Sequence, residues 1–124
     1  MTSVLVVDDN DRNRKLALDV LGAAGFRTFG SATAAEGIAL AREQVPDVIL
    51  MDLRLPDMDG VDATRRLAAH ERTALIPVVA MSASPLEGSE DWLEEAGFAG
   101  WLEKPILVSM FPEQVRRYSV GRTE

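Results

Sequence analysis

The chain has 124 residues, 47% of them hydrophobic, which is enough for one domain with a proper core. Its net charge of −7 disfavours non-specific binding to nucleic acid, and the absence of cysteine excludes disulfides and thiolate metal sites. No apolar run approaches the roughly 20 residues that span a bilayer. The opening MTSVLVVDDN lacks the basic segment of a signal peptide, so we expect a cytoplasmic protein without membrane contact.

The first half of the chain alternates between short apolar runs and amphipathic stretches. Residues 4–7 (VLVV) form an unbroken apolar run, which is typical of a strand buried on both faces. A weaker strand is expected at residues 27–29, and the capping box at residues 33–36 (TAAE) predicts a helix that runs to about Gln44. Between the two strands we predict a helix that stops at Gly25. Its helix-spaced apolar positions are Leu16, Ala17, Val20, Leu21 and Ala24.

The second half continues the alternation. Strands are expected at residues 48–51, 77–81 and 100–102. Helices are expected at residues 61–69, near the end of segment 84–97 with Leu93 and Ala96 toward the core, and from an N-cap near Ser109 to about Tyr118. The last N-cap follows from Pro112, because proline is tolerated only in the first turn of a helix. We place one domain at residues 1–119 and a polar tail at residues 120–124.

This alternation predicts an α/β fold. Strands that alternate with helices form a parallel sheet covered by helices on both faces, with right-handed crossovers. Five such units in about 120 residues fit a five-stranded parallel sheet of order 2-1-3-4-5 flanked by five helices, which is the flavodoxin-like arrangement. Ligands of such folds bind at the carboxyl ends of the strands, near the switch in strand order.

Polar side chains follow four of the predicted strands. They are Asp8 and Asp9 after the first strand, Asp52 at the end of the third, Ser82 after the fourth and Lys104 after the fifth. In the order 2-1-3-4-5 the first strand neighbours the third, so the three aspartates should converge, with Ser82 and Lys104 on the other side.

The chemistry of this set suits a metal and a phosphoryl group. Three close carboxylates repel one another unless a cation neutralises them. Mg²⁺ prefers oxygen ligands and is commonly held by a few carboxylates plus phosphate oxygens. Lys104 and Ser82 suit the phosphoryl oxygens, and Asp52 can act as a nucleophile that forms an acyl phosphate. A carboxylate directly after a buried apolar run is costly unless it has partners, and a metal and Lys104 would be the partners of Asp52 at the end of VILMD.

Four motifs in order, VDDN, LMDLRLPDMDG, VVAMSA and WLEKP, closely resemble the receiver domain of bacterial two-component response regulators, of the single-domain type. The resemblance covers essentially the whole chain. It includes the loop after Asp52, where Pro56 follows four residues later and Gly60 eight residues later.

The resemblance implies that Asp52 accepts a phosphoryl group from a histidine kinase or a histidine phosphotransfer protein, with Mg²⁺ as cofactor. Ser82 and Lys104 would hold that group, and a cis bond between Lys104 and Pro105 would orient the lysine. By match, the metal ligands would be Asp9, Asp52, the backbone carbonyl of Arg54 and, through a water, Asp8.

The resemblance also implies a phosphorylation-dependent switch. Ser82 would move toward the phosphoryl group, and the aromatic residue three positions before Lys104 would turn inward. The surface of the fourth helix, fifth strand and fifth helix would then change for a downstream protein partner. The aromatic residue is Trp101 where the family usually has Phe or Tyr, so it is either core filler or switch.

Further residues are assigned to partner contact or to phosphoryl lifetime. Asn13 and Arg14 sit where family members meet their phosphodonor. Trp92 is either packed or an exposed contact for a partner. The side chain of Arg54 is expected to overhang the phosphoryl group and to restrict attacking water. We expect a monomer or a weak phosphorylation-dependent dimer, with no direct nucleic-acid contact.

Two alternatives have a different chemistry. One is a metal-binding pseudo-receiver that acts by protein contacts without phosphorylation, which the intact acidic set, Ser82 and Lys104 disfavour. The other is an aspartate-nucleophile phosphohydrolase of the haloacid dehalogenase type. Such enzymes carry a second aspartate where this chain has Arg54, which cannot serve as acid or base. We therefore expect no enzyme in the ordinary sense, although family members promote their own phosphorylation and dephosphorylation.

Overall fold

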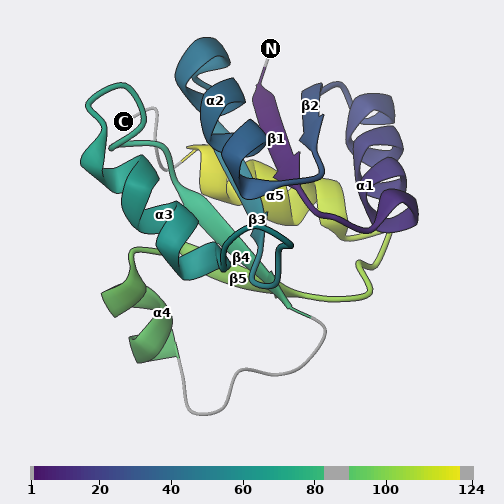
Figure 1. Ribbon diagram of the computed structural model, residues 1–124. Coiled ribbons are helices and arrows are strands. Elements are labelled where there is room, and N and C mark those ends of the chain that lie inside the picture. The colour runs from purple at the N-terminus through teal and green to yellow at the C-terminus, as the bar shows by residue number, and fades with distance from the viewer. Residues whose placement is uncertain (1, 83–89, 121–124) are drawn as a thin grey trace.

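The computed structural model describes residues 2–82 and 90–120, and Figure 1 shows a parallel sheet with helices packed on both of its faces. The strand order is β2-β1-β3-β4-β5, as predicted. The strands are β1 (Ser3–Val7), β2 (Arg27–Ser31), β3 (Val48–Asp52), β4 (Val78–Ser82) and β5 (Gly100–Glu103). The helices are α1 (Asp11–Ala23), α2 (Ala34–Gln44), α3 (Gly60–Ala69), α4 (Glu90–Ala96) and α5 (Phe111–Val120).

The alternation of side chains along the central strands divides the core into two layers. Leu5, Val7, Ile49 and Met51 pack toward α2, α3 and α4. Their neighbours in sequence pack on the opposite face, toward α1 and α5; among them are Val4, Val6, Val48 and Leu50. Residues 4–7 of β1 and 48–51 of β3 are therefore all apolar, which explains the unbroken apolar runs in the sequence.

Local capping fixes where the helices begin and end. Asn10 and Asp59 cap α1 and α3 by accepting hydrogen bonds from backbone amides three residues on, each at 2.9 Å. Thr33 caps α2 in the predicted way, with its hydroxyl accepting from the Glu36 amide at 3.2 Å. Gly25 ends α1 at φ +97°, a conformation that favours glycine, and Phe26 N donates to Leu21 O across it.

Several predicted element boundaries were off by one or two residues, among them those of β2, β4 and α5. Strand β2 extends to Ser31 rather than to residue 29, because its pairing with β1 continues as far as Val7 and Ser31. Strand β4 is shifted by one residue and ends at Ser82. Helix α5 begins at Phe111, one residue later than an N-cap at Ser109 implies, because residues 107–110 first form a turn in which Met110 N donates to Leu107 O.

Two further predictions concern the helices. Pro112 lies in the first turn of α5, as expected, and that helix runs to Val120, two residues past its predicted end. Leu16, predicted as a core position of α1, is 42% exposed, because it lies at the edge of the stripe centred on Ala17 and Leu21. The Trp92 side chain, the beginning of segment 84–97 and tail residues 121–124 lie outside the description.

Candidate functional site

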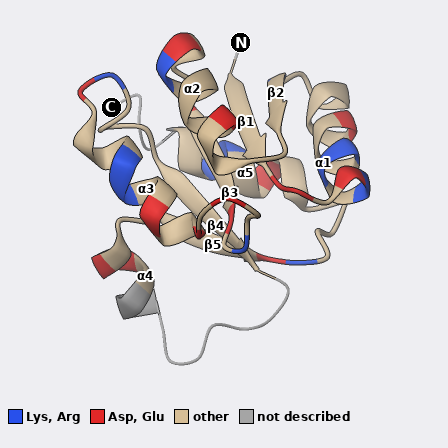
Figure 2. Ribbon diagram, viewed as in Figure 1, with Lys and Arg blue, Asp and Glu red and all other residues tan. Residues whose placement is uncertain are grey.

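Three aspartates meet at the carboxyl ends of β1 and β3. Strand pairing brings Val7 opposite Met51, so the residues that follow, Asp8 and Asp52, lie side by side at this edge of the sheet. One carboxylate oxygen from each of Asp8, Asp9 and Asp52 lies within 4.8 Å of the others. Asp8 is 1% exposed and Asp52 is 8% exposed, whereas Asp9 faces solvent. Figure 2 shows the acidic segment between β1 and α1 in red at this edge of the sheet. The predicted convergence of the aspartates is therefore present.

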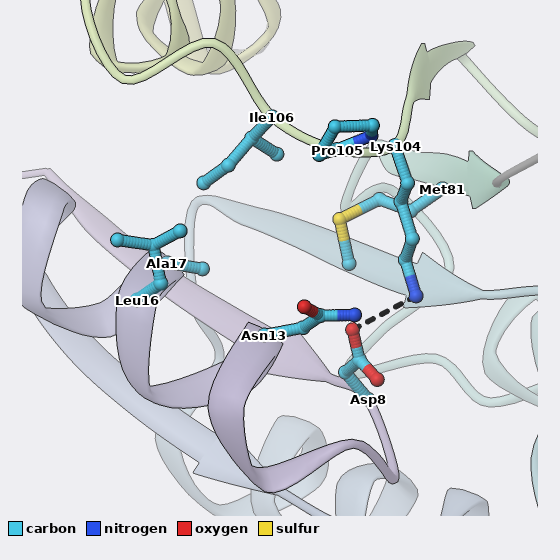
Figure 3. Close-up of a pocket in the computed structure, with 8 residues that line it drawn as sticks. All are labelled: Asp8, Asn13, Leu16, Ala17, Met81, Lys104, Pro105 and Ile106. Atoms are coloured by element: carbon cyan, nitrogen blue, oxygen red, sulfur yellow. Dashed lines mark ion pairs between the residues drawn. The ribbon is translucent and has the colours of Figure 1, made fainter.

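Lys104 bridges the two buried carboxylates. Its Nζ lies 2.9 Å from Asp8 Oδ2 and 2.8 Å from Asp52 Oδ2, and Figure 3 shows the pair with Asp8. The backbone supports this position: the Lys104–Pro105 bond is cis, as expected, and Lys104 N donates to Ser82 O at 2.7 Å. Burial lowers the pKa of Lys104, but its hydrogen bonds and attraction to Asp52 and Asp8 outweigh burial and leave the pKa above 10.5. The ammonium is therefore charged at neutral pH.

The second oxygen of each buried carboxylate accepts a hydrogen bond from a backbone amide. Asp52 Oδ1 accepts from Arg54 N at 3.0 Å, and Asp8 Oδ1 accepts from Asn10 N at 2.9 Å. Both carboxylates are thus oriented by an amide on one side and by Lys104 on the other. Among the described side chains, in residues 2–82 and 93–119, no buried nitrogen or oxygen lacks a hydrogen-bond partner.

The turn after Asp52 packs closely on the first residue of α3. Gly60 N donates to Leu53 O at 3.0 Å, and a bridge joins Arg54 to Asp59 across the loop. A Cβ atom on Gly60 would lie only 2.6 Å from the carbonyl oxygen of Asp52 and 2.9 Å from Leu53 Cα. A side chain at position 60 would therefore push directly on the backbone of Asp52.

Two other predicted site residues lie on β4 and in the β3–α3 loop. Ser82 is the last residue of β4, half-buried, and its backbone carbonyl accepts from Lys104. Arg54 is exposed, and its backbone amide is the group that contacts Asp52.

The two α1 residues assigned to partner contact differ in their surroundings. Asn13 is exposed, and Figure 3 shows its amide beside Asp8 and Lys104, where it lines a small cavity of about 30 Å³. Arg14 instead contacts its own loop, donating to Asp8 O at 2.8 Å and to Asp11 Oδ1 at 2.7 Å. Arg14 therefore braces the turn that carries Asp8 and Asp9.

An apolar surface beside Lys104 was missed by the sequence reasoning. Four large apolar side chains are between 42% and 61% exposed; they are Leu16 on α1 and Leu107, Val108 and Met110 between β5 and α5. The signal was the run ILVSM after Pro105, which is apolar but belongs to no strand. Leu16 and Ile106 line the same pocket as Lys104, and exposed apolar side chains next to a polar site are typical of a protein contact.

Trp101 lies on β5 and is not part of the acidic cluster, by which we mean Asp8, Asp9 and Asp52. It is half-buried against the core layer under α2, α3 and α4. Together with Leu93, Phe98 and Tyr118 it lines a hollow of about 270 Å³.

The donor atoms of the acidic cluster fit a hard divalent cation. The cluster offers carboxylate oxygens only, and Mg²⁺ and Ca²⁺ prefer such ligands. The one histidine of the sequence, His70, caps the end of α3 and accepts from Arg72 N, so imidazole plays no part here. The residues present thus suit Mg²⁺ rather than a softer metal.

A family model described as the response regulator receiver domain matches residues 4–116. The chain belongs to the receiver domain family. Among curated relatives, the polar-differentiation response regulator DivK of Brucella ovis is 38% identical over 116 residues, which cover 94% of each chain. The receiver domain is thus a signalling module of two-component systems rather than an enzyme in the ordinary sense.

Solved structures support the same fold. The chemotaxis protein CheY4 of Vibrio cholerae superposes with a TM-score of 0.89 at 24% identity, covering 95% of this chain and 98% of that one. The receiver domain of the sensor histidine kinase PA1611 from Pseudomonas aeruginosa has a TM-score of 0.86 at 31% identity, covering 96% and 98%. That structure has a magnesium ion coordinated in its active-site cleft. Within the described residues of the present receiver domain, no helix has the length and apolar content to cross a membrane.

Proposed function

We propose that this receiver domain is a phosphoacceptor: Asp52 takes a phosphoryl group from a phosphohistidine of a histidine kinase or histidine phosphotransfer protein, in a step that needs Mg²⁺. One observation carries the proposal. A single ammonium, that of Lys104, lies within 2.9 Å of both buried carboxylates, and Asp9 completes an acidic cluster at the mouth of the same site. This arrangement supports Asp52 as the nucleophile, because a cation and a candidate metal-binding set lie beside it.

The reaction is a simple group transfer. A carboxylate oxygen of Asp52 forms a bond to phosphorus while the bond from phosphorus to the imidazole nitrogen breaks. The imidazole, which carries a proton on its other ring nitrogen, leaves with the electron pair as a neutral ring. The product is an acyl phosphate on Asp52 and a neutral histidine on the donor. Catalysis of such transfers rests on positioning and on charge neutralisation, because the phosphoryl oxygens carry the negative charge.

Each nearby residue has a role in this scheme. Lys104 is oriented by its two carboxylate contacts, and its ammonium would move onto a phosphoryl oxygen as that group arrives. The hydroxyl of Ser82, at the end of the neighbouring strand, would donate to a second phosphoryl oxygen. The hydrogen bond from Arg54 N to Asp52 Oδ1 keeps the nucleophilic carboxylate in one orientation before transfer.

Mg²⁺ would be held by Asp9, Asp52 and the backbone carbonyl of Arg54, with Asp8 contacting a water ligand. Bound there, it supplies positive charge that offsets repulsion between the carboxylates and the incoming phosphoryl group. The chemistry of the three carboxylates supports this assignment, as does the magnesium ion of the PA1611 receiver domain.

The phosphodonor would dock over α1 and the β5–α5 connection. Leu16 and Ile106 line the same pocket as Asn13 and Lys104. The exposed apolar residues Leu107, Val108 and Met110 follow Ile106 in the chain. An apolar patch next to the nucleophile suits a helical partner that presents its phosphohistidine to Asp52. We expect Asn13 to contact that partner.

The output would be a change on the α4–β5–α5 surface. We expect the hollow that Trp101 lines to leave the indole room to change its position when Ser82 moves toward the phosphoryl group. A downstream protein would then bind the altered surface, with the domain a monomer or a weak dimer in the cytoplasm.

Incubation with acetyl phosphate tests the proposal. We expect the intact mass to increase by one phosphoryl group in the presence of Mg²⁺, but not with EDTA and not in the Asp52→Asn variant. Failure of the parent protein to gain mass would favour a pseudo-receiver that binds partners without phosphorylation. Repeated turnover of p-nitrophenyl phosphate would instead indicate a phosphohydrolase.

A further inference from the structure

We propose that Asp57, which lies outside the acidic cluster, is a positioning residue that fastens the β3–α3 loop to the beginning of α2. The metal site has two halves, the β1–α1 turn with Asp8 and Asp9 and the β3–α3 loop that follows Asp52. By fastening the loop, Asp57 keeps the two halves in a fixed position relative to each other. The inference rests on the proposed function, because it assigns Asp57 an effect on Mg²⁺ binding at that site. It adds a residue that no metal contact or phosphoryl contact would identify.

Asp57 makes two directed contacts to a distant helix. Its Oδ1 accepts from Ala34 N and its Oδ2 from Ala35 N, both at 2.9 Å, across 23 and 22 residues of sequence. These amides belong to the first turn of α2, where backbone N–H groups have no partner within the helix and the helix dipole favours an anion. The hydrogen bonds from Ala35 and Ala34 lower the pKa of Asp57 below 3.8, so it is charged at neutral pH.

The loop that Asp57 fastens also carries the proposed metal ligands of β3. Asp52 ends the strand, and Arg54, whose carbonyl is a proposed metal ligand, also carries the amide that holds the Asp52 carboxylate. The two ends of the loop are joined by the Arg54–Asp59 bridge. Leu55 and Met58 pack against the core, but apolar contacts are not directional. The paired hydrogen bonds of Asp57 add the directional restraint in the middle of the loop.

The beginning of α2 also lies next to the β1–α1 turn, which carries Asp8 and Asp9. Just before α2, the carbonyl of Ser31 accepts from Asp8 N at 3.0 Å, and the Ser31 hydroxyl donates to Thr33 O at 2.6 Å. Gly37, in the first turns of α2, lies directly over the end of β1, where an added Cβ would come within 2.8 Å of Val7 Cγ2.

The beginning of α2 is therefore a common anchor for two loops. The β1–α1 turn, with Asp8 and Asp9, is tied to it through Ser31, and the β3–α3 loop is tied to it through Asp57. Releasing Asp57 would let the β3–α3 loop shift relative to the turn that carries Asp8 and Asp9. Metal affinity depends on both halves at once, so it should fall although Asp57 touches no ligand.

Thr33 offers a matched control on the same helix terminus. Its hydroxyl caps α2 by accepting from Glu36 N, and its side chain has no contact with the β3–α3 loop among the described hydrogen bonds. Loss of the Thr33 cap weakens the beginning of α2 but leaves the loop fastened. The pair of variants thus separates a positioning role of Asp57 from a general stabilising role.

The experiment measures Mg²⁺ binding by titration calorimetry for the parent, Asp57→Ala, Asp57→Asn and Thr33→Ala. We expect Asp57→Ala to bind about tenfold more weakly, at the low end for residues that support metal ligands. Asp57→Asn, which keeps one acceptor oxygen, should lie between that variant and the parent. Thr33→Ala should bind within about twofold of the parent. Heteronuclear NMR spectra confirm that each variant is folded.

A second readout uses the reciprocity of linked equilibria. If the fastened loop favours metal binding, bound Mg²⁺ must favour the fastened loop. Mg²⁺ should therefore slow exchange of the Ala34 and Ala35 amide hydrogens with water in the parent, and not in Asp57→Ala. Equal losses of affinity in Asp57→Ala and Thr33→Ala would overturn the inference, as would parent-like binding by Asp57→Ala. A parent that binds no Mg²⁺ would overturn the proposed function as well.

Discussion

Replacement of Lys104 by methionine tests how the buried carboxylates are held. The variant keeps a side chain of similar length but loses the ammonium that contacts Asp8 at 2.9 Å and Asp52 at 2.8 Å. The two carboxylates, which are 2% and 11% exposed as side chains, would then face each other without their cation. In the absence of metal they repel, and neither is solvated well enough to relieve the repulsion.

The expected loss in free energy of unfolding of Lys104→Met lies between the values for exposed and for fully buried ion pairs. Exposed pairs contribute about 0–1 kcal/mol, and removal of one partner from a fully buried pair costs about 3–5 kcal/mol. The Lys104 side chain is 15% exposed at the rim of the site, so we expect the free energy of unfolding to fall by about 2 kcal/mol at pH 7 without metal. Saturating Mg²⁺ should recover more stability in the variant than in the parent, because the cation then takes over the neutralisation.

Urea denaturation followed by circular dichroism, with and without Mg²⁺, measures both effects. Lys15→Met is the control, because Lys15 forms a pair with Asp19 at the same distance of 2.8 Å but on the exposed surface of α1. We expect no measurable loss from that control. If Lys104→Met is no less stable than Lys15→Met in the absence of Mg²⁺, Lys104 does not hold the buried carboxylates and the reasoning fails.

Three other predictions address the same site. In Gly60→Ala the new Cβ meets the Asp52 backbone, so we expect a loss of about 1–3 kcal/mol in urea denaturation together with weaker Mg²⁺ binding, whereas Gly22→Ala, with nothing within 4 Å, should be neutral or stabilising. Arg54→Ala should lose its phosphoryl group severalfold faster by intact mass, and a lifetime equal to the parent's would exclude shielding by Arg54. The folded-state pKa of Lys104 lies above its ordinary 10.5, so its contribution is complete below pH 10.5 and is lost as pH rises through the folded value. Denaturation above that pH should therefore show an extra loss in the parent that is missing in Lys104→Met.

The convergence of the acidic cluster was predictable because it depends on strand order and strand ends. Asp8 and Asp52 each terminate an apolar run, and once β1 and β3 are neighbours the pairing of Val7 with Met51 brings them together. Lys104 follows from the same logic on β5. A buried strand appears in the sequence as an apolar run, so the end of the run predicts the end of the strand.

Contacts made by loops were not predictable in this way. The hydrogen bonds of Asp57 to Ala34 and Ala35 depend on the path of the β3–α3 loop, which no periodicity in the sequence encodes. Arg14 reads as a surface residue of α1, yet it folds back onto the Asp8 carbonyl because a long side chain at that position reaches its own turn. Leu16 fits the helical spacing but faces solvent, since α1 is flanked by α5 and β2 only along the Ala17 stripe.

Location of the modified residue tests the central proposal most directly. After incubation with acetyl phosphate and Mg²⁺, borohydride reduction converts an aspartyl phosphate to homoserine, which peptide mass spectrometry assigns to one position. We predict homoserine at position 52, formed only when Mg²⁺ is present. Homoserine at position 8 or 9, or metal-independent modification of Asp52, would contradict the assignment of the acidic cluster as a magnesium site that serves a single phosphoacceptor.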